Sequence, residues 1–119
     1  MKNNFISKEV RSFGYALSGI AACIKKDRHI RFHFIAVGIV SAAGIYLNLS
    51  LVEWCVILLC IAAVIAAEMF NSAIERLTDL ISKEHNPLAG EIKDISAGAV
   101  LICCVISILV AAIILIGKL

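Results

Sequence analysis

The chain has 119 residues, of which 61% are hydrophobic and only 17% are charged. An ordinary soluble domain has about 45–50% apolar residues even with glycine counted, so this excess excludes a disordered chain and argues against a soluble fold. With eleven basic and nine acidic residues and a net charge of +2, the chain has too few charges to cover the surface of a compact globule. We therefore expect lipid to be its main solvent, and we expect no nucleic acid among its partners.

The first predicted element is an amphipathic helix over about residues 5–25. Charged residues interrupt its apolar sequence, so it lacks the long apolar core of a cleavable signal peptide. A helix with one apolar face lies in the membrane interface rather than across the bilayer. The simpler alternative is an anchor that only fixes the position of the next helix. The apolar residues that recur every three or four positions are Phe5, Ile6, Val10, Phe13, Leu17, Ile20 and Ile24.

Three apolar stretches then predict transmembrane helices over about residues 30–48, 53–80 and 92–117. A helix needs about 20 residues to cross a hydrocarbon core of about 30 Å. The first and last stretches coincide with uncharged runs of 21 and 23 residues, whereas the middle one crosses only if Glu68 lies inside the membrane. We therefore predict a single domain over residues 1–119, an all-α integral membrane protein with one interfacial helix and three transmembrane helices.

The basic residues predict how these helices are oriented in the membrane. Ten of the eleven Lys and Arg residues fall on one predicted side, and only Lys118 falls on the other. Because basic residues are enriched in cytoplasmic segments, the side with ten bases is expected to face the cytoplasm. The N-terminus and the loop over residues 82–91 are then inside, while the turn over residues 48–53 and the C-terminus are outside.

The cysteines and histidines give weaker signals. The five cysteines contain no C-x-x-C pair, and four of them lie in the apolar stretches, where cysteine behaves as a small buried hydrophobe. His29 and His33 have the i, i+4 spacing of metal ligands on a helix. Since no third ligand lies near them in the sequence, we interpret both as polar residues of the membrane interface.

The most informative segment is a polar stripe of four residues in the middle predicted span: Glu68, Asn71, Glu75 and Asp79. At about 100° per residue they fall within about 80° of the helix circumference, and they extend over about 16 Å. An ionisable residue at the bilayer centre costs about 2.5–3.5 kcal/mol on insertion scales, so a functional role is favoured. The alternative is that Glu75 and Asp79 are an ordinary charged helix end and that Glu68 pairs with a base from another helix.

The stripe has the chemistry of a phosphate-transfer site. A poorly solvated carboxylate such as Glu68 is suited to accept a proton as a general base. Glu75, nearer to water, is suited to Mg²⁺, which binds one or two carboxylates and keeps substrate phosphate oxygens. Lys93 and Asp94 are expected to open the last helix, where backbone N–H groups attract anions. The sequence has no glycine-rich phosphate loop, so side chains and helix ends would hold the nucleotide.

These residues resemble the signature of a known family. The pattern Glu68-x-x-Asn-Ser-Ala-Ile-Glu75-x-x-x-Asp79, followed after thirteen residues by Lys93-Asp94, is similar to that of the small bacterial membrane lipid kinases. These form the prokaryotic diacylglycerol kinase and undecaprenol kinase family, and the resemblance covers nearly the whole chain. The segments 51–54 and 85–89 look like the Gram-positive branch, whose members are typically undecaprenol kinases.

The resemblance implies a homotrimer in the bacterial cell membrane, with active sites between subunits on the cytoplasmic side. Its members use Mg-ATP to phosphorylate the hydroxyl of a membrane lipid. The expected reaction converts undecaprenol to undecaprenyl phosphate, and the alternative is a diacylglycerol kinase that produces phosphatidic acid. Rival interpretations from other classes are a small channel or proton-relay protein, since carboxylates inside a membrane also mark ion paths, and a non-enzymatic anchor subunit.

The resemblance also assigns roles to individual residues. Glu68 is expected to be the general base, with Asn71 as a second catalytic residue. Asp27 and Glu75 are expected to bind the metal, although Asp27 stands where the family usually has the longer Glu. Ser18 and Glu68 match lipid-binding positions. The positions that match contacts of ATP or its Mg²⁺ are Lys8, Tyr15, Asp27, Glu75, Glu84, His85, Asn86, Lys93 and Asp94.

Overall fold

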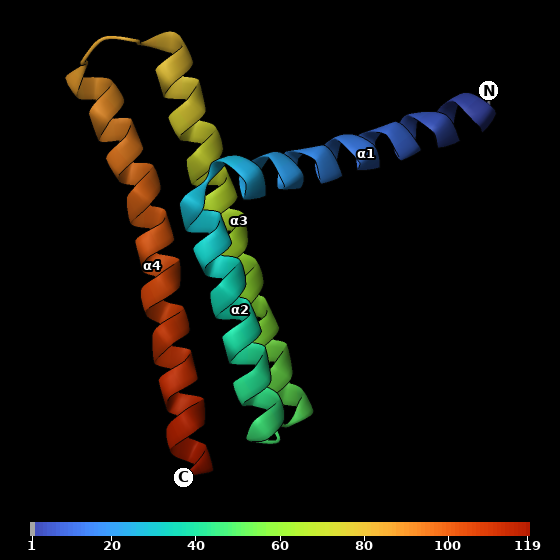
Figure 1. The fold of residues 1–119 in the computed structure, drawn as a ribbon, viewed down its shortest axis with the longest axis vertical. Helices are drawn as coiled ribbons and strands as arrows, with labels where there is room; N and C mark the ends of the chain where they lie inside the picture. Colours follow the sequence, from blue (N-terminus) through green and yellow to red (C-terminus); the bar gives the residue numbers. More distant parts are fainter. Residues whose placement is uncertain (1) are drawn as a thin grey trace.

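A computed structural model describes the backbone of residues 2–119 and the side chains from Asn4 onward. All regular secondary structure in this range is helical, in four helices. Figure 1 shows that α2, α3 and α4 run alongside one another, while α1 points away from them at a steep angle. The all-α prediction is confirmed, and the three helices of the bundle are each long and apolar enough to cross a membrane.

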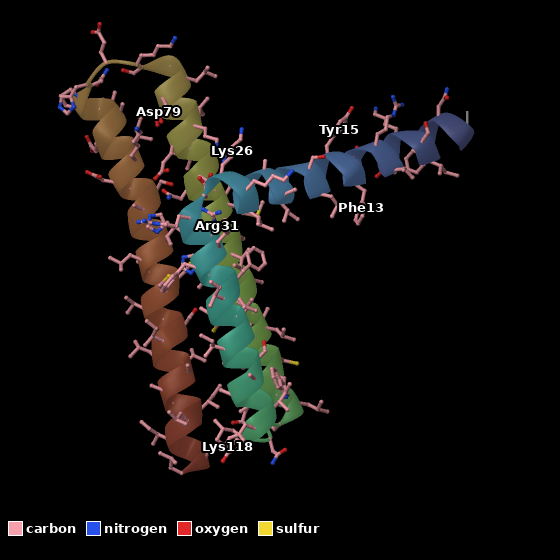
Figure 2. The ribbon with its side chains drawn as sticks, viewed as in Figure 1. Phe13, Tyr15, Lys26, Arg31, Asp79 and Lys118 are labelled. Atoms are coloured by element: carbon pink, nitrogen blue, oxygen red, sulfur yellow. The ribbon has the colours of Figure 1, made fainter. Side chains whose placement is uncertain are left out.

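Helix α1 spans Lys2–Lys26 and makes only limited contact with α2 and α3. Its large apolar side chains are exposed; Phe13, for example, is 68% exposed. Figure 2 shows Phe13 and Tyr15 on opposite sides of α1, with Tyr15 directed towards the end of the bundle that carries the α3–α4 loop. The two sides of α1 therefore present different side chains.

Helix α2 spans Arg28–Tyr46, and a short turn joins it to α3. In this turn Asn48 has a φ of 55°, a left-handed conformation that asparagine tolerates better than most residues. The turn brings the ring of Trp54 against Gly44, where a Cβ atom would lie 2.7 Å from Trp54 Cη2. A glycine is therefore required for this close approach.

Helices α3 and α4 are the longest elements, spanning Leu51–Ile81 and Pro87–Lys118. The 31 residues of α3 extend over about 46 Å, about 16 Å more than the hydrocarbon core of a bilayer. The expected span 92–117 lies within α4, which begins earlier because the Asn86 side chain accepts a hydrogen bond from the Leu88 N–H at 2.9 Å. Both helices are therefore long enough to extend beyond the hydrocarbon core of a bilayer.

The bundle has two ends that differ in which helices they connect. The turn end carries residues 47–50 and the C-terminus of α4, and the loop end carries residues 82–86. At the turn end Lys118 Nζ lies 3.0 Å from Glu53 Oε1 and 3.1 Å from the carbonyl oxygen of Asn48. This contact ties the end of α4 to the beginning of α3.

Burial in the bundle is the reverse of that in a soluble protein. Among the described side chains only three apolar ones are buried, whereas most of the large apolar side chains of α2, α3 and α4 are exposed. Five polar residues are buried between the helices. They are Glu68, Asn71, Ser72, Thr78 and Ser96. A polar interior beneath an apolar surface is the arrangement expected for transmembrane helices in lipid.

Candidate functional site

The polar stripe runs along the side of α3 that faces its neighbouring helices. Glu68 is 6% exposed and Asn71 is 8% exposed, while Glu75, one turn nearer to the loop end, is exposed. Ser72, for which the sequence predicted no role, is buried beside them at 4% exposure. The stripe therefore passes from a buried carboxylate to a solvent-accessible one within two turns of helix.

Glu68 meets a basic group from another helix, as the structural alternative allowed. His33 Nε2 of α2 lies 3.5 Å from Glu68 Oε2, and the two side chains are 19% and 8% exposed. The sequence suggested that His33 is a polar residue of the membrane interface, and the structure adds a contact between helices that this interpretation did not include. No local pattern could have predicted this contact, since its partner is 35 residues away in the chain.

Asn71 has one satisfied and one unsatisfied polar atom. Its Nδ2 group donates a hydrogen bond of 3.2 Å to Glu75 Oε1, which fixes the amide along the stripe. Its Oδ1 atom is buried, and within the part of the chain that the structure describes it accepts no hydrogen bond. Since a buried polar atom without a partner costs about 1–3 kcal/mol, this oxygen is suited to a donor or cation supplied by a ligand.

Asp27 joins the stripe from the junction of α1 and α2. It occupies the N-cap position of α2, but its side chain does not cap that helix. Instead its Oδ2 atom accepts a hydrogen bond from the Ser72 hydroxyl and lies 3.3 Å from a guanidinium nitrogen of Arg76. The carboxylate thus faces α3 at the level of Glu75, which lies between Ser72 and Arg76 in the sequence.

The side chains near Glu75 offer oxygen atoms of the kind that magnesium binds. No group of three or more Asp, Glu, His and Cys side chains that could hold a metal is found among the described residues. Mg²⁺ does not need such a cage, because it usually binds one or two carboxylates and completes its shell with water and phosphate oxygens. Asp27 and Glu75 supply two carboxylates, and the free Asn71 Oδ1 atom is a further hard oxygen.

Lys93 lies across from the stripe on α4. Its ammonium group forms an ion pair with Asp79 Oδ1, so the structure brings Lys93 to one end of the polar stripe. The prediction that Lys93 and Asp94 open the last helix is wrong, because α4 begins at Pro87 and both residues lie about two turns into it. A nucleotide phosphate would therefore meet the lysine side chain there rather than the start of a helix.

The other expected nucleotide contacts lie at two separate places. Glu84, His85 and Asn86 are exposed at the loop end, and Asn86 also caps α4. Lys8, Tyr15 and Ser18 are exposed on α1. Tyr15 precedes Asp27 by twelve residues, which is about 18 Å along a helix axis. Within one chain, Tyr15 is therefore held well away from the end of α1 that joins the polar stripe.

An apolar cavity of about 350 Å³ lies between α2, α3 and α4. Within residues 2–119, α2 and α4 each pack against α3 but not against each other, which leaves this space between them. His33 lines it, and its other lining residues are Phe32, Ala36, Val37, Val40, Ile57, Cys60, Ile61, Val64, Ile65, Cys104, Ser107, Ile108 and Ala111.

The cavity and the polar stripe form one continuous surface on α3. Ile57, Ile61 and Val64 precede Glu68 at intervals of three and four residues, so all four lie on one face of the helix. This register is visible in the sequence, and it could have predicted the apolar half of the site. The arrangement can hold an amphipathic molecule, with its apolar chain in the cavity and its polar group at Glu68.

Comparison with known proteins gives consistent results. The sequence model of the prokaryotic diacylglycerol kinase family matches residues 14–115. The chain is 37% identical over 116 residues to undecaprenol kinase of Bacillus subtilis, which covers 98% of this chain and 94% of that protein. It is 32% identical over 110 residues to a diacylglycerol kinase of Synechocystis, covering 91% of this chain and 62% of that one. With diacylglycerol kinase of Escherichia coli it shares 26% identity over 117 residues, covering 97% and 96%.

Proposed function

The chain belongs to the prokaryotic diacylglycerol kinase family, and from this premise we propose that it transfers the γ-phosphoryl group of ATP to the hydroxyl of undecaprenol. The family consists of lipid kinases, so the chain is a membrane enzyme with a lipid substrate and ATP as the phosphate donor. This identity favours the kinase interpretation over the channel and anchor alternatives.

One observation carries the proposal: the apolar cavity between the helices is lined by His33, whose side chain contacts the buried carboxylate of Glu68. A lipid alcohol needs this combination, because its chain must stay in an apolar environment while its hydroxyl meets a base. The choice of undecaprenol rests on the 37% identity to an undecaprenol kinase. The second candidate is diacylglycerol, favoured by the similarity to the diacylglycerol kinases of two other bacteria.

In the proposed mechanism Glu68 accepts the proton of the lipid hydroxyl. The lipid oxygen then forms a bond to the γ-phosphorus, while the bond from that phosphorus to the β-phosphate oxygen breaks and ADP leaves. Asp27 and Glu75 would hold Mg²⁺, which when bound neutralises charge on the phosphate oxygens. Lys93 would exchange its ion pair with Asp79 for a contact with the nucleotide phosphates. Phosphoryl transfer depends mainly on such positioning and charge neutralisation.

The rest of the nucleotide site is proposed to come from two copies of the chain. Asp94, Glu84, His85 and Asn86 of one copy would be joined by Lys8 and Tyr15 from α1 of another. Ser18 would contact the lipid head. The geometry supports this arrangement because α1 extends away from the bundle of its own chain (Figure 1). We propose a homotrimer with α1 in the inner membrane interface, the N-terminus and the loop end in the cytoplasm, and the C-terminus outside.

Phosphate incorporation tests the substrate. Purified protein in mixed micelles is given labelled ATP, Mg²⁺ and either undecaprenol or diacylglycerol, and the labelled lipid is quantified. We expect a larger kcat/KM for undecaprenol. A larger value for diacylglycerol would reject undecaprenol in favour of the second candidate, and no incorporation into either lipid would contradict the proposal as a whole.

Subunit mixing tests the shared site. Tyr15→Ala and Glu68→Gln proteins are each expected to have little activity, because each lacks one part of every site. When the two are mixed and reassembled, some sites combine an intact α1 with an intact α3, and activity should return. A mixture that is no more active than its components would show that both residues act within the same chain.

A further inference from the structure

The contact between His33 and Glu68 has no place in the proposed mechanism so far. It joins α2 to α3 at the polar end of the apolar cavity, with His33 Nε2 lying 3.5 Å from Glu68 Oε2. We propose that His33 is a positioning residue of the kinase reaction, whose Nε2–H group holds the Glu68 carboxylate in the orientation that accepts the lipid proton. This inference rests on the proposed function and extends it.

Burial explains why Glu68 needs such a partner. Its side chain is 8% exposed in a part of the bundle surrounded by apolar surface, where a carboxylate without a hydrogen-bond donor is costly. Among the side chains from Asn4 onward, His33 provides the ring nitrogen that lies against this carboxylate. Hydrogen bonds of catalytic groups are often long in the absence of substrate and tighten when it binds, so the distance of 3.5 Å suits this role.

An imidazole is better suited to this position than a lysine or an arginine. A permanent positive charge beside Glu68 would stabilise the ionised carboxylate and weaken it as a base. A neutral imidazole still donates one N–H hydrogen bond, so it orients the carboxylate without adding a charge. His33 can therefore fix the orientation of the Glu68 carboxylate without reducing the ability of Glu68 to accept a proton.

The two carboxylate oxygens then have separate tasks. Oε2 faces His33, and Oε1 is left for the lipid hydroxyl. When the lipid O–H bond breaks, the proton moves to Glu68 Oε1 and the lipid oxygen forms its bond to the γ-phosphorus as ADP leaves. His33 keeps its own proton throughout.

The cavity places this pair where a lipid hydroxyl would arrive. His33 lies on the same face of α2 as Ala36, Val37 and Val40, which line the cavity further towards the turn end. The imidazole thus lies, next to Phe32, at the end of the cavity lining of α2 that is nearer to the polar stripe. A chain that fills the cavity would bring its polar end to the pair.

Three substitutions at His33 test the position of the donor atom. The amide nitrogen of Gln can occupy the place of His Nε2, whereas the amide nitrogen of Asn is closer to the backbone and matches Nδ1. We expect His33→Gln to keep kcat within about threefold of the wild type, and His33→Asn and His33→Leu to lower it about 30- to 100-fold, because misplacing a catalytic group by about 1 Å can cost about 100-fold. The KM for ATP should change less than twofold in each.

Asn and Gln have the same polar group, so the comparison between them separates positioning from folding. Equal kcat values for His33→Gln and His33→Asn would overturn the inference, as would a fully active His33→Leu protein. The matched control is His29→Leu, one turn earlier on α2, where the side chain is exposed and full activity is expected. A wild-type protein without lipid kinase activity would instead overturn the proposed function, and this inference with it.

A double substitution tests whether His33 acts through Glu68. In a Glu68→Gln background the carboxylate that His33 positions is absent, so adding His33→Leu should not lower the residual rate further. A further loss of tenfold or more would show that His33 acts on the substrate itself, and it would overturn the positioning role.

Discussion

The two ends of the bundle use polar side chains in opposite ways. At the turn end the Ser50 hydroxyl accepts a hydrogen bond from the Glu53 N–H at 3.2 Å, and Glu53 Oε1 accepts one from the Ser50 N–H at 2.9 Å. Lys118 completes this cluster from α4, at the position that Figure 2 labels near the α2–α3 turn. Each of these groups has a partner, and together they define where α3 begins and where α4 ends.

Towards the loop end the polar groups are less completely paired. Asn71 Oδ1 is buried and accepts no hydrogen bond from the residues that the structure describes, and the Asp27 carboxylate contacts α3 instead of capping its own helix. Among the described side chains, the Lys93 ammonium is paired with the exposed carboxylate of Asp79. The polar groups of the turn end are thus engaged in holding the fold, whereas the less completely paired inner groups are the ones that we propose bind ligands.

The largest effect is expected from Glu68→Gln, which tests whether the polar groups towards the loop end serve the reaction rather than the fold. The amide keeps the size of the side chain but cannot accept the proton of the lipid hydroxyl. Because a positioned general base contributes about 10²- to 10⁴-fold, kcat for lipid phosphorylation should fall by at least about 100-fold. The thermal unfolding midpoint should not fall, since the variant removes a buried charge.

Initial rates and thermal denaturation in the same detergent provide the measurement. A Glu68→Gln protein that phosphorylates lipid at the wild-type rate would contradict the assignment of the base. A protein that loses activity only in proportion to its unfolded fraction would show that Glu68 is structural, like the polar groups of the turn end.

The next largest effect is expected at the proposed metal ligands. Asp27→Asn and Glu75→Gln should raise the Mg²⁺ concentration for half-maximal activity by at least about tenfold, since even the groups that orient metal ligands contribute about 10- to 100-fold. Asp27→Glu should remain active because it keeps a carboxylate at this position. A magnesium titration of the initial rate measures the effect.

Glu91→Gln is the matched control for these substitutions, because it removes an exposed carboxylate at the beginning of α4 that has no proposed role. Its magnesium dependence should equal that of the wild type. If Asp27→Asn and Glu75→Gln behaved like this control, the two residues would not be ligands.

The fold was largely predictable because its signal is local in the sequence. Apolar runs and the spacing of charges predicted four helices, and the structure has α1 to α4 at those places. The start of α4 was missed because the cap formed by Asn86 and Pro87 was interpreted as part of a loop. The cap residues were visible, but the charges that follow them suggested that the helix begins later.

The candidate site was predictable only where it lies on one helix. The stripe from Glu68 to Asp79 follows from helical geometry, and the structure places these residues along α3 as expected. The contacts of Asp27 with Ser72 and of His33 with Glu68 depend on how α2 packs against α3. No periodicity within a single segment contains that information.

A smaller effect, on stability alone, is expected from Gly44→Ala at the turn end. The new Cβ atom would lie 2.7 Å from Trp54 Cη2 and 3.0 Å from Leu49 Cδ1, and overpacking of this kind costs about 1–3 kcal/mol. The thermal midpoint should fall by several degrees, while kcat of the folded protein stays unchanged. Gly38→Ala is the control on the same helix, because nothing lies within 4 Å of its Cβ position. A loss of kcat in Gly44→Ala would mean that the turn end is coupled to the reaction.

The smallest effect is expected from Glu53→Gln, which isolates the ion pair with Lys118. Gln can still accept the hydrogen bond from the Ser50 N–H, so the capping box remains and only the charge interaction is lost. Both partners are 25% exposed, and ion pairs in contact with water contribute little to stability. The decrease in the thermal midpoint should therefore be smaller than that of Gly44→Ala, and it should shrink further at high salt. A decrease as large as that of Gly44→Ala would show that this end is held mainly by charge rather than by packing against Trp54.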